Sequence, residues 1–422
     1  MVTTLLSFGL EQVVVRRIAA SKTSDWAAAA FFFHALAGSV LGFLLMLVLA
    51  QLLTADESLR YLPWFFLAQS ITFVGTPLKQ FLNAKQQFTP YGVIAFIANI
   101  IKVTVAFILI YGNLLSIVSV YIVLIACALI ELSGLLWYVF VKVGLKVAFK
   151  KIAYLKLLKE ASSQYLLVIF DSSLSRIDVI LMGLIATKAL TGEYSFAYRA
   201  FEISRLPIVV IAPIIMAKFA KMFGGVSKLG EEKKTEVATL FSVEMFLAIL
   251  IPLSLNILWG PVVDWVSKGK YGYSNATEFL ILSICIPMQF AINMFWTLAF
   301  ASKRYKAVSA ITIVTAVLNL LLNFIFIPIY GGVGAASVFL FTIIVQVALY
   351  YYMVRKRVMH LPIRSFVIFI LLGGISYYIV NIIDVHVIVK LILAVVLYVL
   401  FSVVLKQIGK RHLITLKAYL KK

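Results

Sequence analysis

Apolar runs of about 20 residues recur along this chain of 422 residues, from Ala27 to Leu405. Each run is long enough to cross the hydrocarbon core of a bilayer, roughly 30 Å thick, as an α-helix. Hydrophobic residues make up 63% of the chain and charged residues only 13%, whereas about 25% of a typical soluble domain is charged. The sequence therefore predicts an all-α polytopic membrane protein.

Hydropathy windows of about 19 residues predict twelve complete spans. They cover residues 27–53, 61–81, 93–111, 114–141, 165–186, 194–217, 237–259, 279–300, 307–329, 333–353, 366–383 and 385–405. A further apolar stretch, 1–19, contains Glu11 and Gln12 and is predicted to form a partial first span. It does not read as a secretory signal peptide, because Arg16 and Arg17 follow the apolar part instead of preceding it.

Lysine and arginine lie on alternate loops between these spans. Most of the 38 basic residues fall in one set of loops and in the C-terminal tail, whereas the other set holds only Arg60, Lys188, Lys268 and Lys270. The positive-inside rule places the first set, and with it the C-terminus, in the cytoplasm. The net charge of +21 is thus a topology signal, and we expect no nucleic-acid partner.

The parity of the spans makes the N-terminus unusual. Thirteen crossings and a cytoplasmic C-terminus would place Met1 outside the cell, without a signal to carry it there. One additional upstream helix would give a cytoplasmic N-terminus and fourteen crossings. We therefore expect that the first helix of the fold is missing from this chain, through a start codon assigned inside the gene or in a shortened homologue.

An internal repeat indicates two halves. AKQQF (84–88) precedes IYG (110–112), and ASKRY (301–305) precedes a second IYG (329–331), with Asn99 and Asn319 at matching positions. Both copies run in the same direction, so the halves would be related by an axis along the membrane normal. We predict an N-terminal lobe (1–143), a basic amphipathic cytoplasmic linker (144–163), a C-terminal lobe (164–358), a final transmembrane pair (359–408) and a basic cytoplasmic tail (409–422). A solvated loop is the alternative for the linker.

The residues offer little for catalysis or metal binding. Cys127 and Cys285 both lie in apolar runs, so we expect neither a disulfide nor a zinc site. The four histidines are scattered, and His34 is expected to be a hydrogen-bonded residue within a span. The sequence shows no phosphate loop and no long extramembrane loop, which argues against an ATPase. We predict that the protein is not an enzyme and uses no cofactor or metal.

Charged residues inside a bilayer are costly and therefore mark functional sites. They concentrate in two consecutive spans. The first contains Asp171, Arg176 and Asp178, and the second contains Arg199, Glu202 and Arg205, spaced three residues apart so that Glu202 can reach either arginine. Arginines offer bidentate contacts to phosphate or carboxylate, which favours a cavity that meets an anionic substrate. The alternative is a structural network of ion pairs between the two helices.

Other spans contain single charges. Lys102, Glu131 and Glu244 lie within spans, Glu11 could line the same cavity from the first half, and Lys390 is expected to extend from the outer end of its helix to water. The predicted substrate-binding residues are Arg176, Arg199, Arg205 and Lys102. The predicted ion-coupling or charge-balancing residues are Asp171, Asp178, Glu202, Glu131 and Glu244.

Four stretches together resemble a known family. FGLEQVVVRRIA (8–19), SRIDVILMG (175–183), TGEYSFAYRAFEI (191–203) and LNLLLNFIFIPIYGGVGAASV (318–338) are similar, in order and spacing, to the motifs of the Wzx-type oligosaccharide flippases that serve polysaccharide biosynthesis. That family belongs to the multidrug/oligosaccharidyl-lipid/polysaccharide exporter superfamily. The resemblance extends from Phe8 to about Leu405.

The resemblance implies a fold and an activity. The fold has fourteen helices, in two pseudo-symmetric six-helix lobes of the MATE-like kind plus a final pair. The activity is the transfer of undecaprenyl-diphosphate-linked oligosaccharide, the repeat unit of O-antigen, capsule or exopolysaccharide, across the bacterial inner membrane by alternating access coupled to H⁺ or Na⁺. The implied partners are this substrate, membrane lipids and other polysaccharide-assembly proteins.

Three alternatives remain. A cation-coupled multidrug exporter has the same fold, but we would expect it to have an acidic, aromatic pocket instead of arginines. A membrane glycosyl enzyme, such as a polymerase or ligase, would be expected to have a long outer loop with Arg or His. A scaffold in a polysaccharide-assembly complex is the third alternative.

Overall fold

The computed structural model describes residues 2–20, 25–52, 60–85, 87–145, 151–223, 230–302 and 304–409. Within these ranges every regular element is helical, which confirms the predicted all-α class. The chain divides into two compact units, Met1–Ser172 and Ser173–Lys422. The five predicted segments stay predictions, and nearly all of the basic tail lies outside the described residues.

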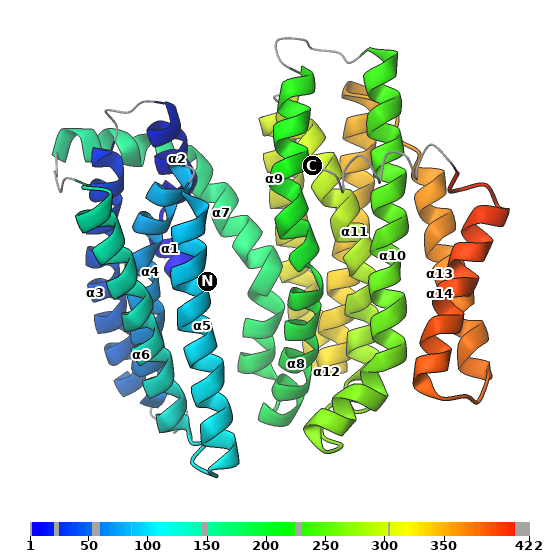
Figure 1. Cartoon of the computed structure of the whole chain (residues 1–422), viewed down its shortest axis with the longest axis horizontal. Coiled ribbons are helices and arrows are strands. Elements are labelled where there is room, and N and C mark those ends of the chain that lie inside the picture. Colours follow the sequence, from blue (N-terminus) through cyan, green and yellow to red (C-terminus); the bar gives the residue numbers. More distant parts are fainter. Residues whose placement is uncertain are drawn as a thin grey trace. The chain divides into compact units, whose positions relative to one another are not determined.

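Unit 1 contains the helices α1 to α6 and the first part of α7 (Figure 1). Their bounds are α1 Val2–Leu6, α2 Leu10–Ala20, α3 Trp26–Leu52, α4 Leu62–Ala84, α5 Phe88–Tyr111, α6 Ile117–Leu136 with a π-helical extension Trp137–Lys142, and α7 Lys151–Ile185. Helix α4 packs against α3 and α6, and α5 packs against α6. The side chains of Phe31, Phe73 and Phe81 lie in the interior of this bundle.

The apolar stretch 1–19 is not one continuous helix. Phe8 and Gly9 both have positive φ values, 51° and 70°, and separate α1 from α2. A Cβ atom on Gly9 would lie 3.4 Å from the backbone nitrogen of Tyr165, so α7 approaches the chain closely here. A glycine is favoured at this position because it adopts positive φ without a steric penalty.

The basic linker is helical from Lys151 onward, whereas Gly144 and Leu145 are not helical. Helix α7 begins at Lys151 and continues without a break into the following predicted span. Arg17 forms an ion pair with Glu160. His34 bonds through Nδ1 to the Tyr154 hydroxyl (2.7 Å) and through Nε2 to the carbonyl of Leu6 (2.7 Å), as expected of a hydrogen-bonded histidine within a span. These contacts attach the linker to the rest of unit 1.

Unit 2 contains the end of α7 and seven further helices (Figure 1). These are α8 Lys188–Ser204, α9 Leu206–Phe223, α10 Glu231–Ser267, α11 Ala276–Ala301, α12 Tyr305–Arg357, α13 Ile363–Ile382 and α14 Val387–Val404. Large aromatic side chains join them: Phe241 stacks on Phe295 at 5.6 Å and Phe246 on Tyr398 at 5.2 Å between ring centroids. Because lipid is as apolar as these side chains, close packing rather than hydrophobic burial stabilises such contacts.

The predicted span 194–217 is divided in two. Helix α8 ends at Ser204, Arg205 forms its C-cap, and α9 begins at Leu206. Pro207 occupies the first turn of α9, where a residue without an N–H group leaves no helical bond unmade. The proline therefore marks the start of a new helix at the end of α8.

The second IYG motif marks a reversal of the chain inside α12. Gly331 has φ 54° and ψ −131°, which are not helical values. Hydrogen bonds join residues on either side of it: Asn319 Nδ2 to Thr342 Oγ1 and Gln346 Nε2 to Thr315 Oγ1, both 3.4 Å. These pairs are centred close to Gly331. Helix α12 is thus an antiparallel hairpin of two helices, as the predicted spans 307–329 and 333–353 require.

Eight of the described helices are long and apolar enough to cross a membrane, and α12 counts as one of them. Helices α4, α7, α8 and α9 are not among the eight. Helix α8 has 17 residues and contains Arg199 and Glu202, so it is both short and interrupted by charge. The count of twelve complete spans stays a prediction.

Candidate functional site

Helices α7 and α8 form a tight antiparallel pair in unit 2. Two residues, Ala186 and Thr187, connect them. Thr187 caps α8 by accepting a hydrogen bond from the backbone N–H of Leu190 (3.4 Å). The Thr191 hydroxyl donates to the carbonyl of Met182 across the connection (2.9 Å). This pairing brings the two charged stretches of the sequence side by side.

The inner face of this pair contains a buried carboxyl. Asp178 of α7 and Tyr194 of α8 are both fully buried, and the Tyr194 hydroxyl donates a hydrogen bond of 2.5 Å to Asp178 Oδ2. The backbone N–H of Val179 donates to Asp178 Oδ1 (2.8 Å). Both carboxyl oxygens therefore have a donor, as a buried acidic group requires.

Aromatic rings surround the buried carboxyl. Tyr198 lies one helical turn from Tyr194, with ring centroids 6.0 Å apart. Phe201 packs edge-on against Phe339 of α12 at 5.5 Å. At the turn of α12, a Cβ atom on Gly332 would lie 3.4 Å from Tyr194 Cβ. The inner face is therefore an acidic group inside a closely packed aromatic environment.

The outer face carries three ionised side chains in a row. Glu202 accepts from Arg199 Nη1 (2.9 Å) through Oε2 and from Arg176 Nη2 (3.3 Å) through Oε1. The first contact joins residues of one helix, and the second joins α8 to α7. The side chains of Arg199 and Arg176 are 71% and 47% exposed, against 24% for Glu202. We call Arg176, Arg199 and Glu202 the charged face.

Arg205 does not bond to Glu202, although its spacing would allow it. Its guanidinium lies over the ring of Phe201, 5.1 Å from the centroid, in a cation–π contact. Arg205 forms the C-cap of α8, where helical spacing ends, and this displaces its side chain from the row. The guanidinium is half-buried and adds another positive charge next to the charged face.

The other predicted site residues are dispersed. Lys102 donates to Asn99 Oδ1 (3.1 Å) and Glu131 pairs with Lys79 (2.8 Å), all within unit 1. Glu244 of α10 is buried in unit 2, and neither of its carboxyl oxygens has a hydrogen-bond partner. The Asp171 side chain lies outside the described residues. The structure therefore brings Arg176, Arg199, Glu202, Asp178 and Arg205 into one helix pair, and it does not place Lys102, Glu131 or Glu244 there.

Glu11 belongs to unit 1. It accepts from Gln80 Nε2 (3.2 Å) and borders a small polar cavity of about 100 Å³ with Thr72 and Thr76. Sequence reasoning did not assign Tyr194 a role. A tyrosine 16 residues from Asp178 gives no periodic signal, and only the turn between α7 and α8 brings the two together.

The charged face has a net positive charge. Two arginines share one carboxylate, and Arg205 has an aromatic partner instead of an acidic one. The guanidinium groups present several N–H donors in a planar arrangement that suits phosphate or carboxylate oxygens. The arrangement can hold an anion at its exposed side, while the Asp178–Tyr194 pair on the buried side can exchange a proton or a small cation.

Comparison with solved structures identifies the fold. The chain is similar to the lipid II flippase MurJ in an inward closed conformation, with a TM-score of 0.71 and 15% identity over 96% of this chain and 92% of MurJ. An inward-facing multidrug resistance MATE family transporter of the MOP superfamily gives 0.67 at 14% identity, over 84% of this chain and 86% of the other. The Vibrio cholerae MATE transporter VcmN in its bent form gives 0.56 at 15% identity, over 84% and 85%.

These similar structures are a lipid II flippase and two MATE transporters, one of which is described as a member of the MOP superfamily. No protein-family model matches the sequence. No curated protein matches it either. The chain therefore has the fold shared by MurJ and the MATE transporters, as the sequence motifs predicted for the superfamily.

Proposed function

We propose that this protein is a flippase that moves undecaprenyl-diphosphate-linked oligosaccharide, a polysaccharide repeat unit, across the bacterial inner membrane. The observation that carries the proposal is the charged face, where two exposed arginines share one carboxylate in the α7–α8 pair. We propose that this pair lies within the membrane, where a positive surface is costly unless an anion meets it. A lipid-linked diphosphate carries such an anion on a membrane anchor, and the fold is that of a lipid II flippase.

In this mechanism Arg176, Arg199 and Arg205 hold the diphosphate, and Glu202 keeps the two outer guanidiniums in position until substrate arrives. Asp178 is the proposed coupling group, since it is a buried carboxyl held by Tyr194 on the reverse side of the same helices. Binding of H⁺ or Na⁺ at Asp178 would change the packing of α7 against α8. It would thereby favour exposure of the substrate-binding site to one side of the membrane over exposure to the other.

The remaining predicted residues have supporting roles in the proposal. Lys102 is a proposed substrate-binding residue of unit 1, and the Lys79–Glu131 pair of that unit would balance charge. Glu244 would act as a second ion-coupling carboxyl, because an ionised carboxylate without a partner is unfavourable at such a buried position. We propose that the C-terminus is cytoplasmic and that membrane lipids and polysaccharide-assembly proteins are partners.

A second candidate function is cation-coupled export of small organic cations. The buried Asp178 among Tyr194, Tyr198 and Phe201 favours it, since acidic and aromatic groups together suit a cation. The MATE transporters with this fold include a multidrug resistance protein. The exposed arginines oppose it, because they would repel a cationic drug at the same helix pair.

Reconstitution into liposomes distinguishes the two functions. We expect transfer of a fluorescent undecaprenyl-diphosphate oligosaccharide between leaflets, dependent on an H⁺ or Na⁺ gradient, and no uptake of ethidium. Empty liposomes and liposomes with Asp178→Asn protein provide the controls. Ethidium transport without lipid transfer would assign the protein to the second function and contradict the first.

A further inference from the structure

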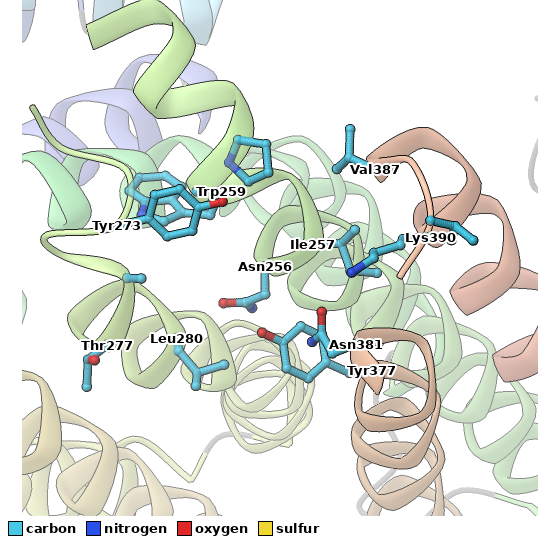
Figure 2. Close-up of a pocket in the computed structure, with 14 residues that line it drawn as sticks. Asn256, Ile257, Trp259, Tyr273, Thr277, Leu280, Tyr377, Asn381, Val387 and Lys390 are labelled. Atoms are coloured by element: carbon cyan, nitrogen blue, oxygen red, sulfur yellow. The ribbon is translucent and has the colours of Figure 1, made fainter. Parts of the chain in front are cut away.

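A pocket of about 440 Å³ lies at one end of unit 2 and shares no residue with the charged face. The end of α10 and the start of α11 form one side, and the end of α13 and the start of α14 form the other (Figure 2). The turns at this end are those that the distribution of basic residues predicts to be extracytoplasmic. The pocket therefore belongs at the outer interface of the membrane.

Lys390 is the charged residue of this pocket. It is half-buried and is the one charged residue in α14, an otherwise strongly apolar helix. Figure 2 shows its ammonium group directed into the recess, toward Ile257 and Tyr377. Among the described residues Lys390 makes no ion pair. The sequence predicted an extension into water, whereas the structure directs the charge into a cavity that contains no carboxylate.

Uncharged polar groups converge on the same space. Asn256, Tyr377 and Asn381 come from two different helices and face the recess (Figure 2). The amide of Asn256 is fixed, since its Nδ2 donates to the carbonyl of Pro252 and to Ser283 Oγ, both at 2.7 Å. Both amide hydrogens of Asn256 are thereby used within the protein, and Lys390, Tyr377 and Asn381 supply the ammonium, hydroxyl and amide donors of the cavity, the combination that binds phosphate oxygens.

The side formed by α10 and α11 is rigid before any ligand arrives. Asp264 accepts from the backbone N–H groups of Gly272 (2.6 Å) and Tyr273 (3.2 Å), which fixes the connecting turn. A Cβ atom on Gly260 would lie 2.5 Å from the Tyr273 ring, so the ring lies directly against the helix. Trp259 stacks on Phe279 at 3.6 Å. Trp and Tyr are the residues that proteins place at the headgroup level of a membrane.

We propose that this pocket binds the phosphate headgroup of a membrane phospholipid, with Lys390 as its counter-charge. Ile257, Leu280 and Val387 supply the apolar part of the lining. The same ends of α13 and α14 expose Ile382 (68%) and Ile388 (56%), which suits contact with acyl chains more than with water. The proposal goes beyond transport and does not rest on the proposed substrate, since the pocket and the charged face are built from different residues.

The test uses the purified full-length protein in detergent. Native mass spectrometry measures bound lipid, and thermal melting measures stability. Phosphatidylglycerol is compared with diacylglycerol of the same acyl chains, which lacks the phosphate. We expect phosphatidylglycerol to bind and raise the melting temperature, and diacylglycerol to do neither. Lys390→Met should weaken phosphatidylglycerol binding at least about tenfold, because a charge-assisted contact is lost, whereas Lys390→Arg should retain most of it.

Lys270→Met is the matched control, since Lys270 lies in the outer turn at the same end and does not line the pocket. It should bind phosphatidylglycerol as the unmodified protein does. Thr277→Trp, which fills the pocket without removing charge, should reduce binding as Lys390→Met does, and it keeps the test valid if Lys390→Met is poorly folded.

Several results would overturn the proposal. If Lys390→Met and Thr277→Trp both bind phosphatidylglycerol as tightly as the unmodified protein does, the lipid binds elsewhere. A loss of phosphatidylglycerol binding in Lys270→Met as large as that in Lys390→Met would show a non-specific effect of charge. Full stabilisation by inorganic phosphate alone would make the ligand a soluble anion, and stabilisation by undecaprenyl diphosphate but not by phosphatidylglycerol would assign the pocket to a polyprenyl lipid.

Discussion

The two halves of the chain repeat a topology but differ in how they accommodate polar groups. In unit 1 the repeated asparagine, Asn99, is exposed and bonds to its own helix, whereas its counterpart Asn319 in unit 2 is fully buried between the two arms of α12. Each ion pair of the described part of unit 1 joins one basic and one acidic side chain, as Lys79 does with Glu131. In unit 2, by contrast, Arg176 and Arg199 both form ion pairs with Glu202.

The features that the two halves share concern the fold, and we relate the features that differ to function. A repeat needs only matching spans and turns to preserve a fold, and both halves have them. An excess of positive charge in membrane helices has a cost that a fold does not require. We propose that the charged face of unit 2 serves substrate binding, whereas the one-to-one ion pairs of unit 1 stabilise the fold.

The largest expected effect comes from the repeated turn. Gly331 has a φ of 54°, whereas Gly112 in the first copy has a φ of −78° and the positive φ falls on Asn113 instead. Gly331→Ala should destabilise the protein by about 1–3 kcal/mol, because an L-residue is strained in that conformation. Gly112→Ala should have a much smaller effect. Melting of both purified variants tests the comparison, and equal losses would contradict it.

A second prediction concerns the buried carboxyl of unit 2, which has no counterpart among the paired charges of unit 1. Asp178→Ala leaves the buried Tyr194 hydroxyl without its acceptor, at a cost of about 1–3 kcal/mol, and should reduce the amount of folded protein. Asp178→Ala combined with Tyr194→Phe should recover much of that loss. Membrane abundance measures both. If membrane abundance does not recover in the double variant, Asp178 stabilises the fold through other contacts.

A smaller effect separates the two asparagines. Asn319→Ala removes a polar contact between the arms of α12 and should cost about 0.6 kcal/mol, the average for such contacts in membrane proteins. Asn99→Ala should leave the melting temperature unchanged, because its side chain bonds within its own helix. A larger loss for Asn99→Ala than for Asn319→Ala would reverse the comparison of the two halves.

The sequence predicts what is local and periodic. The helical class and the reversal at the second IYG motif follow from hydropathy and glycine, whereas the break between α8 and α9 divides a stretch that hydropathy predicts to be one span. The Glu202–Arg199 pair follows from a spacing of three residues on one helix.

Contacts between helices could not be predicted in this way. The Arg176–Glu202 pair and the Asp178–Tyr194 bond depend on the rotation of α7 against α8, which periodicity does not determine. Arg205 departs from its predicted row because α8 ends there. Lys390 was interpreted alone, and its pocket requires groups from α10, α11 and α13 as well.

The most direct test of the central claim is lipid transfer by reconstituted Arg199→Ala protein. If Arg199 holds the diphosphate, its loss should weaken substrate binding by about 1.5–3 kcal/mol and impair transfer at nearly normal protein abundance. Arg199→Lys should rescue it only in part, since the charge remains but the planar fork is lost. Arg199→Ala combined with Glu202→Gln should stay impaired. Full transfer by that double variant would show that the arginine only neutralises Glu202 and would contradict the account.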